Sequence, residues 1–370
     1  MIEGIQIKNF KSIKEADLEL SNLNVLAGMN GMGKSSLIQV LLLLKQSEFK
    51  SLSHGRLELN SKDLLSLGKG KDIYYQFAES STIEFKIKTQ DPELLQWKFK
   101  YVSDKEYLQS EEQYREFDFS KINLFSDNFQ YIDAERIGPK PTYSSAVPFE
   151  IENSRQIGNQ GEFAVYYLNS FGSSFRIKHH QLFHPKGQSK NLVHQVNAWL
   201  GEISPGTKLN TTAVPGTELV ILDYQFETNS DYTDRFRPIN VGFGITYALP
   251  VVLSLLMAKK DRLIIIENPE AHLHPRGQAE MGRLIALAAS VGSQIIIETH
   301  SDHILNGIRV AAKNGDINHR DINLFFFDRV NTDFEQYSSI TPIKVDNKGE
   351  LSAYPKNFLQ EWNDQLFKLI

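Results

Sequence analysis

Gly28-Met29-Asn30-Gly31-Met32-Gly33-Lys34-Ser35-Ser36 matches the pattern G-x-x-x-x-G-K-[ST] at every fixed position. The apolar residues 23–27 before it predict a buried strand, and residues 37–44 after it predict a buried helix. Glycines in such a loop let backbone N–H groups close around phosphate oxygens, and the start of the helix turns its unpaired N–H groups to the same anion. The stretch therefore predicts a strand–loop–helix unit that binds phosphate, rather than a glycine-rich turn that happens to precede a helix.

The side chains of this loop have separate expected roles. Lys34 supplies a positive charge for the β- and γ-phosphates of a nucleoside triphosphate, and the Ser35 hydroxyl is suited to bind Mg²⁺. The residues expected to bind the nucleotide here are Asn30, Gly31, Gly33, Lys34, Ser35 and Ser36.

Composition excludes several classes of protein. The chain has 370 residues, enough for two small domains or one large one, and its 41% apolar content is ample for a core. It contains no cysteine, which excludes disulfides, thiolate metal sites and cysteine nucleophiles. No run of 18 apolar residues and no secretory signal is present, so we expect a cytoplasmic protein without a membrane partner. The net charge of −5 argues against a broadly basic nucleic-acid-binding surface.

The N-terminal third is predicted to be rich in strands. Period-2 alternation in 5–20 and in 55–102 indicates paired strands and an antiparallel meander, with 73–77 expected as one of its strands. Residues 104–121 are polar and predict an exposed helix or loop. Phe10 has two interpretations that the sequence leaves open, a place beside a bound base or a place in the core or turn.

The middle of the chain is predicted to be an inserted lobe. Residues 140–216 combine helical stretches, at 162–169 and 192–200, with turns that contain Gly and Pro, and 218–227 predicts a strand. Its basic residues are interpreted as a solvated face: Lys178, His179, His180, Lys186 and Lys190. Arg136, at the edge of a strand predicted over 129–139, is expected either to reach phosphate or a neighbouring subunit, or to be a surface arginine paired with a carboxylate.

The C-terminal third contains a second set of buried strands. Residues 263–266 predict a strand buried on both faces, which places Glu267 at the carboxyl edge of a parallel sheet, where ligands of α/β sheets bind. Residues 276–289 predict a helix, and 294–298 predict the next strand, followed directly by His300. A further strand is predicted at 324–327, while Gly242 and Gly244 open an apolar helix whose start is a second anion-binding terminus.

Together these segments resemble the ABC-type ATPase heads of the SMC/RecF/OLD group, in particular stand-alone bacterial AAA-like ATPases with a small C-terminal domain of unknown function. The resemblance covers 1–46 and 236–330. It implies an α/β P-loop NTPase with a mixed central sheet, an antiparallel β lobe and an inserted helical lobe. The implied boundaries are 1–139 and 236–335 for the two parts of the head, 140–235 for the inserted lobe and 336–370 for the C-terminal domain.

The resemblance also implies roles for particular residues. Residues 28–36 correspond to Walker A and 263–270 to Walker B, with Glu267 as the Mg²⁺-linked acid. His300 corresponds to the switch histidine that contacts the γ-phosphate. Gly242 and Gly244 take the place of the signature loop that binds the γ-phosphate of the opposite subunit, although the usual Leu-Ser-Gly-Gly is absent. The Gln-loop glutamine is either Gln46 or Gln130, and the alternative for each is a plain surface glutamine.

One position departs from the family pattern. Asn268 stands where the family has its general base, and an amide has no useful basicity. Either Glu270 or a neighbour then takes the role of base, or hydrolysis is slow and ATP acts mainly as a dimerising switch.

The expected function is that of an ATP- and Mg²⁺-binding, slowly hydrolysing ATPase that dimerises, or forms a higher homo-oligomer, around ATP. The resemblance implies control of a separate effector, a nuclease or toxin, in anti-phage defence. The alternatives are a DNA repair or maintenance ATPase, with DNA as a ligand, and a non-hydrolysing nucleotide-gated scaffold. A transporter subunit is disfavoured by the long insert.

Two other patterns have plain and functional interpretations. The histidines at 272, 274, 300 and 303 lack the dense spacing of a metal site, and we expect His272 and His274 to shape a subunit-contact loop instead. The C-terminal aromatic residues Phe358, Trp362 and Phe367 predict a helix that caps the core, with a docking surface as the alternative.

Overall fold

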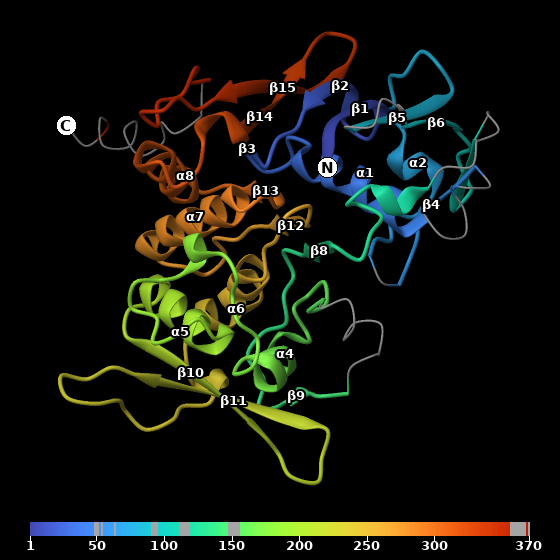
Figure 1. Cartoon of the computed structure of the whole chain (residues 1–370). Helices are drawn as coiled ribbons and strands as arrows, with labels where there is room; N and C mark the ends of the chain where they lie inside the picture. The colour runs from blue at the N-terminus through green and yellow to red at the C-terminus, as the bar shows by residue number, and fades with distance from the viewer. Residues whose placement is uncertain are drawn as a thin grey trace. The chain divides into compact units, whose positions relative to one another are not determined.

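The computed structural model describes residues 1–47, 52, 55–62, 64–89, 95–110, 118–146, 156–355 and 368. The chain divides into two compact units, and Figure 1 labels their helices and strands. The first contains 1–129, 322–345 and 351–370, and the second contains 130–321 and 346–350. The phosphate-binding motif belongs to the first unit, whereas Glu267, His300 and the 242–244 segment belong to the second. The C-terminal aromatic helix predicted from Phe358, Trp362 and Phe367 lies outside the described residues.

An antiparallel sheet of order β2-β1-β5-β6-β7-β4 forms one part of the first unit. Its strands are β1 (Ile2–Phe10), β2 (Ile13–Glu19), β4 (Arg56–Glu58), β5 (Thr82–Thr89), β6 (Leu95–Lys100) and β7 (Tyr107–Ser110). Alternate residues of β1 and β5 are buried, as the period-2 pattern predicts. Phe10 is buried and packs edge-on against Phe85, so it is a core residue.

Two predictions for this region are wrong. Residues 73–77 do not form a strand, because α2 (Gly70–Ile73) ends there and a turn follows. Their aromatic side chains make tertiary contacts instead: Tyr74 stacks on Tyr101, and the Tyr75 hydroxyl donates a hydrogen bond to Glu335. Within 104–121, which was expected to be a helix or loop, Tyr107–Ser110 forms β7 and pairs with β4 and β6. The sequence does not mark β7 as a strand, because pairing with β4 and β6, rather than a local apolar pattern, stabilises it.

Three other strands of the first unit carry the phosphate-binding motif. β3 (Leu23–Gly28) runs parallel to β14 (Ile322–Asn331), which pairs antiparallel with β15 (Gln336–Lys344). Helix α1 (Lys34–Ser47) follows the motif, as expected, and a 3-10 turn lies at Phe119–Lys121. Strands from the two ends of the chain therefore lie side by side beneath the loop.

In the second unit, β12 (Leu263–Glu267) runs parallel to β13 (Gln294–Thr299), and both are almost fully buried, as predicted. β8 (Phe129–Ile132) is the next strand beyond β12. The helices are α6 (Phe243–Leu256), α7 (Pro275–Ser290) and α8 (Asp302–Asn314). α7 and α8 approach closely at two glycines, because a Cβ at Gly282 or at Gly307 would lie 2.2 or 2.1 Å from a carbonyl oxygen of the other helix.

The region predicted as an inserted lobe, 140–235, falls within the second unit. It contains α4 (Ala164–Phe171), α5 (Leu192–Ile203) and a small sheet of β9 (Tyr143–Ser144), β10 (Thr207–Ala213) and β11 (Leu219–Phe226), in the order β10-β11-β9. Short 3-10 turns occur at His180–Leu182, Pro238–Asn240 and His319–Asp321. The two helical stretches and the strand predicted for this region are confirmed.

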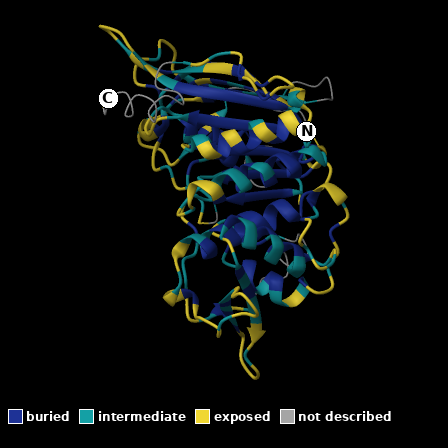
Figure 2. Cartoon of the chain, turned by 90° about the vertical axis from the view of Figure 1, so that its left-hand side faces the viewer, coloured by how far each residue is buried: buried dark blue, intermediate teal, exposed yellow. Residues whose placement is uncertain are grey.

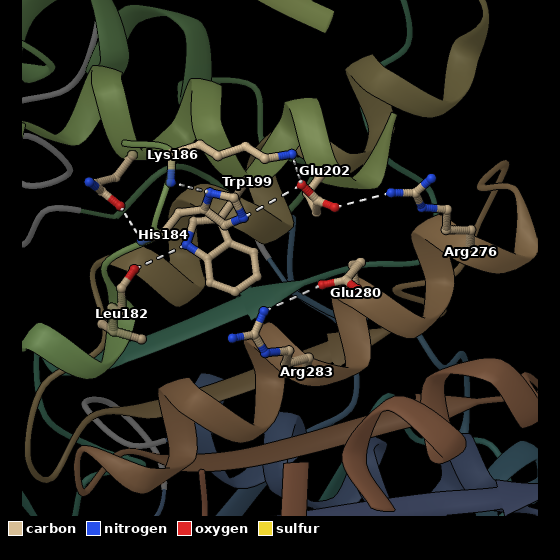
Figure 3. A network of polar contacts seen from close by, with 9 residues as sticks. Leu182, His184, Lys186, Trp199, Glu202, Arg276, Glu280 and Arg283 are labelled. Carbon is tan, nitrogen blue, oxygen red and sulfur yellow. Dashed lines mark hydrogen bonds and ion pairs between the residues drawn. The ribbon is translucent and has the colours of Figure 1, made fainter. Parts of the chain in front are cut away.

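Polar contacts fasten the lobe to α7 (Figure 3). Glu202, in the last turn of α5, accepts hydrogen bonds from Lys186 Nζ (3.0 Å) and from Arg276 Nη2 (3.1 Å). Trp199 donates to the carbonyl of Leu182 (3.0 Å), and the guanidinium of Arg283 lies over its ring. The exposed cation of Lys186 is therefore not merely solvated, because it shares a carboxylate with the first turn of α7.

Buried residues are concentrated in the strands and on the inner faces of the helices, and exposed residues in the connecting loops (Figure 2). No helix within the described residues combines the length and apolarity that crossing a bilayer requires.

Candidate functional site

The loop after β3 adopts a backbone conformation that glycine is needed to form. Gly28, Gly31 and Gly33 have φ angles of +141°, +75° and +97°. Residues other than glycine rarely adopt such φ angles. At Gly33 a Cβ would lie 2.4 Å from the Ser338 hydroxyl oxygen and 2.6 Å from that of Ser12. The glycine spacing of the motif therefore follows from both backbone angle and close packing.

Lys34 lies beneath this loop. Its side chain is buried, and Nζ donates hydrogen bonds of 2.8 Å to the carbonyls of Gly28 and Met29. The ammonium group is thus held against the inner side of the loop, while Asn30 and Gly31 are exposed at its rim. A buried cation below an exposed, glycine-rich rim fits a bound polyphosphate. Ser35, in the first turn of α1, is partly accessible and has a hydroxyl oxygen, which is one of the oxygen ligands that Mg²⁺ can take.

Residues far along the chain support the same loop. Arg329, on β14, donates a hydrogen bond of 2.7 Å to the carbonyl of Gly31. Ser338, on β15, bonds to Ser12 beside Gly33. Sequence reasoning did not find these residues, because nothing in their spacing connects them to the motif about 300 positions earlier.

The ends of β12 and β13 place two carboxylates side by side. Glu267 and Glu298 are in register across the parallel strands, so their side chains project from the same face of the sheet. The Tyr131 hydroxyl donates to Glu267 Oε1 (2.9 Å). Burial, together with the nearby charge of Glu298, raises the pKa of Glu267 to about 7. A divalent cation would compensate such a pair, so the donor set fits Mg²⁺.

Arg136 fixes the main chain immediately after Glu267. Its Nη2 donates to the carbonyls of Glu267 and Asn268, and burial lowers the pKa of this guanidinium to about 10. Only 3% of Arg136 is exposed, so it is neither a surface partner of a carboxylate nor free to reach another subunit, and its contact with phosphate stays a prediction. The sequence cannot reveal a contact that an arginine makes with carbonyl groups.

Asn268 is held in an uncommon conformation. Its φ is +45°, its N–H donates to the carbonyl of Glu298 (2.8 Å), and its own carbonyl accepts from Arg136 (3.1 Å). Asparagine tolerates the left-handed region better than most residues. The backbone therefore provides a reason for asparagine at this position that is independent of proton transfer.

Glu270 joins the turn after β12 to the turn after β13. Its two carboxylate oxygens accept hydrogen bonds from the Thr299 hydroxyl and from the main-chain N–H of His300, each 2.8 Å long. His300 itself is exposed. The second unit thus brings Glu267, Glu270 and the histidine turn to the carboxyl ends of neighbouring parallel strands, where the sequence predicts them.

The two glycines at the start of α6 have different surroundings. Gly242 is the N-cap of the helix, and a Cβ there would meet nothing within 4 Å. At Gly244 a Cβ would lie 2.4 Å from the carbonyl oxygen of His272. The ring of His272 packs on Tyr247, so the loop after β12 lies against this helix. Gly244 is therefore needed for packing within the unit, whereas Gly242 faces open space.

The glutamines considered for the Gln-loop both have structural contacts. Gln46 donates to the carbonyl of Glu58 and accepts from the N–H of Leu65. Gln130 is buried and bonds to the main chain of Tyr131, Ile157 and Gly158. Neither is a plain surface glutamine, and the assignment of the Gln-loop stays a prediction. Within the ranges that the structure describes, no group of three or more His, Asp or Glu residues is arranged to hold a metal by itself.

Comparison with known proteins now decides the family. Residues 23–306, most of the chain, match the family described as "AAA domain, putative AbiEii toxin, Type IV TA system". The chain belongs to this family. Residues 317–369 match a second family, described as a protein of unknown function (DUF3696), which agrees with the expected small C-terminal domain. No curated protein matches the chain.

Solved structures of SMC heads share the fold of this AAA-family chain. One is the SmcHead bound to the C-winged helix domain of ScpA, with 14% identity, coverage of 93% of this chain and 98% of that chain, and a TM-score of 0.52. Another is an Smc head domain with an extended coiled coil bound to the C-terminal domain of ScpA, derived from Pyrococcus furiosus, with 12% identity, coverage of 100% and 99%, and a TM-score of 0.51. The predicted P-loop, ABC/SMC-type head is confirmed, and the family places the chain among ATPases.

Proposed function

We propose that this protein binds ATP with Mg²⁺, hydrolyses it slowly and dimerises with two nucleotides between the subunits. The observation that carries the proposal is the loop of 28–36, in which Lys34 is held beneath an exposed rim of glycine backbone. In the proposed site Lys34 and the loop N–H groups bind the β- and γ-phosphates, while Ser35 and Glu267 hold Mg²⁺. When bound, Mg²⁺ supplies charge neutralisation on the phosphates.

The second half of each site is proposed to come from the other subunit. Gly242, at an unobstructed helix start, and the adjacent Phe243, 58% exposed, support such a contact. Ile239, 51% exposed, adds a second exposed apolar side chain near this helix start, and neighbouring exposed apolar side chains support a surface that another protein covers. His300 of the first subunit would contact the γ-phosphate from its exposed turn.

Lys34→Ala tests the nucleotide site. Loss of a charge-assisted contact to phosphate is worth about 1.5–3 kcal/mol, so we expect ATP affinity to fall about 10- to 100-fold. Equilibrium titration with a fluorescent ATP analogue measures the affinity. The proposal would be contradicted if the wild-type protein did not bind adenine nucleotides, or if the variant bound ATP with unchanged affinity.

Gly242→Ala and Gly244→Ala form a matched pair that tests the dimer. Gly242 has an ordinary φ of −57° and open surroundings, so its alanine variant should keep wild-type stability but lose ATP-dependent dimerisation in light scattering. Gly244→Ala should lower the thermal midpoint, because its Cβ meets the carbonyl of His272. Normal dimerisation of a stable Gly242→Ala variant would count against the arrangement.

The proposed output is control of a separate effector, a nuclease or toxin, in anti-phage defence. The family description, which names a toxin and a toxin–antitoxin system, supports this role. Co-purification of the wild type, but not of Lys34→Ala, with the product of a neighbouring gene would test it; binding that is indifferent to nucleotide would contradict ATP control.

Asn268 favours a second candidate, a nucleotide-gated scaffold that holds ATP without turnover. Steady-state phosphate release separates the two functions. Turnover that disappears in Lys34→Ala supports the ATPase, and ATP-dependent dimerisation without any phosphate release supports the scaffold.

A further inference from the structure

Two side-chain clasps join the turn after β12 to the turn after β13. In the first, Glu270 Oε2 accepts from the Thr299 hydroxyl and Glu270 Oε1 accepts from the N–H of His300, both at 2.8 Å. The Thr299 oxygen in turn accepts from the N–H of Ser301 (3.0 Å). The carboxylate therefore bonds to the residue before His300 and to His300 itself.

The second clasp lies on the other side of the histidine. Ser301 caps α8 by accepting from the N–H groups of His303 and Ile304, and its hydroxyl donates to Gln278 Oε1 (2.5 Å). Gln278 also donates to the carbonyl of Leu273 (2.8 Å), in the turn after β12. His300 is thus the exposed residue between two fixed neighbours, and its backbone has little freedom.

The chemistry of Glu270 suits holding rather than proton transfer. A carboxylate offers only acceptors, and here each oxygen already accepts from one donor, the Thr299 hydroxyl or the His300 N–H. Taking up a proton would weaken both bonds at the moment when the histidine must stay in place. Replacement by glutamine leaves only one oxygen to accept, so the Thr299 hydroxyl would have to turn and accept from the NH₂ group instead of donating, which weakens the clasp.

We propose that Glu270 is a positioning residue, which fixes the backbone of His300 so that its imidazole is presented to the γ-phosphate. The proposal rests on the proposed function, because it assumes that His300 meets nucleotide. This positioning role takes the place of the general-base role, which was considered for Glu270 because position 268 has no carboxylate.

A double-mutant cycle of Glu270→Gln and Thr299→Val tests the proposal. Both variants break the same clasp, so each should lower kcat for ATP about tenfold with little change in KM, and the double variant should lose no more than the worse single. The fall of kcat at low pH, which reports protonation of an essential base, should persist in Glu270→Gln, because Glu270 is not that base. Glu280→Gln, a carboxylate of α7 outside both clasps, is the matched control and should keep wild-type kcat.

The opposite results would assign Glu270 as the base. One such result is that Glu270→Gln loses turnover while Thr299→Val keeps wild-type kcat. Another is that the two decreases in kcat multiply in the double variant. A third is that kcat of Glu270→Gln no longer falls at low pH. A readout without nucleotide keeps the test independent of the proposed function: hydrogen exchange of the His300 amide should quicken at least tenfold in Glu270→Gln. Unchanged exchange would overturn the clasp, whereas faster exchange in a protein without any ATP turnover would overturn only the proposed function.

Discussion

At the scale of single residues, backbone conformation explains the type of residue at a position that the family pattern assigns to catalysis. Asn268 is interpreted from sequence as a lost base, but its φ of +45° and the bonds of its main chain to Glu298 and Arg136 select for a residue that tolerates the left-handed region. The proposed slow hydrolysis and the special turn are therefore compatible with one and the same asparagine.

Asn268→Ala and Asn268→Gly separate these effects. A left-handed conformation costs a residue with a Cβ about 1–2 kcal/mol, so alanine should lower the free energy of unfolding by about 1 kcal/mol more than glycine does. Urea denaturation of the two variants measures the difference. Equal stabilities would show that the turn relaxes and that its conformation does not select asparagine.

At the scale of elements, the lobe and α7 meet in the contacts of Glu202 (Figure 3). His184 is buried there, 3.8 Å from Glu202, against the ring of Trp199. Burial lowers the pKa of His184 below its ordinary value of 6.5, and the charge of Glu202 opposes this effect. Folding therefore favours neutral His184. The unfolded chain takes up the proton first, so this residue makes the protein less stable as the pH falls below about 6.5.

Glu202→Gln tests the electrostatics of this junction. Removing the carboxylate leaves His184 with burial and the positive charges of Lys186 and Arg283, so its pKa should fall further. An NMR titration of the His184 ring measures the change, and Glu227→Gln, an exposed carboxylate of the same unit, is the control. A raised pKa in Glu202→Gln would contradict the contacts described here.

At the scale of the whole molecule, exposed apolar side chains mark where a second copy is expected. Ile239 and Phe243 are 51% and 58% exposed beside Gly242. Burying a phenylalanine is worth about 1.5–3 kcal/mol, so Phe243→Ser should weaken the ATP-dependent dimer about 10- to 100-fold. Analytical ultracentrifugation with ATP and Mg²⁺ measures the affinity.

Phe334→Ser is the matched control for that experiment. Phe334 is 88% exposed between β14 and β15, in the other unit, so its loss should leave the dimer unchanged. Equal effects of the two substitutions would indicate that a general loss of surface apolarity, rather than the proposed contact, weakens association.

The sequence predicts local features of this fold well and distant contacts poorly. The strand, loop and helix around Lys34 are confirmed because their signal lies within about 25 neighbouring residues. β12 and β13 are predictable because burial on both faces leaves an apolar run. Tyr107–Ser110 and the turn at 73–77 depend instead on pairing and stacking partners elsewhere in the chain.

The candidate site shows the same division. Lys34, Glu267 and His300 follow from motifs, and their roles in binding nucleotide stay predictions. The sequence does not mark Arg136 and Arg329 as supports, because each bonds to carbonyl groups, which every residue type has. Periodicity and spacing carry no information about such partners.

The support of the loop at 28–36 by β14 and β15 has a consequence for how the protein is made. Gly31 is bonded to Arg329, and Gly33 packs against Ser338, so the loop lacks these supporting contacts until β14 and β15 have left the ribosome. Nascent chains that end before β14 should therefore fail to capture nucleotide even though they contain the complete motif. The proposed binding of ATP is therefore expected only after β14 and β15 have been synthesised.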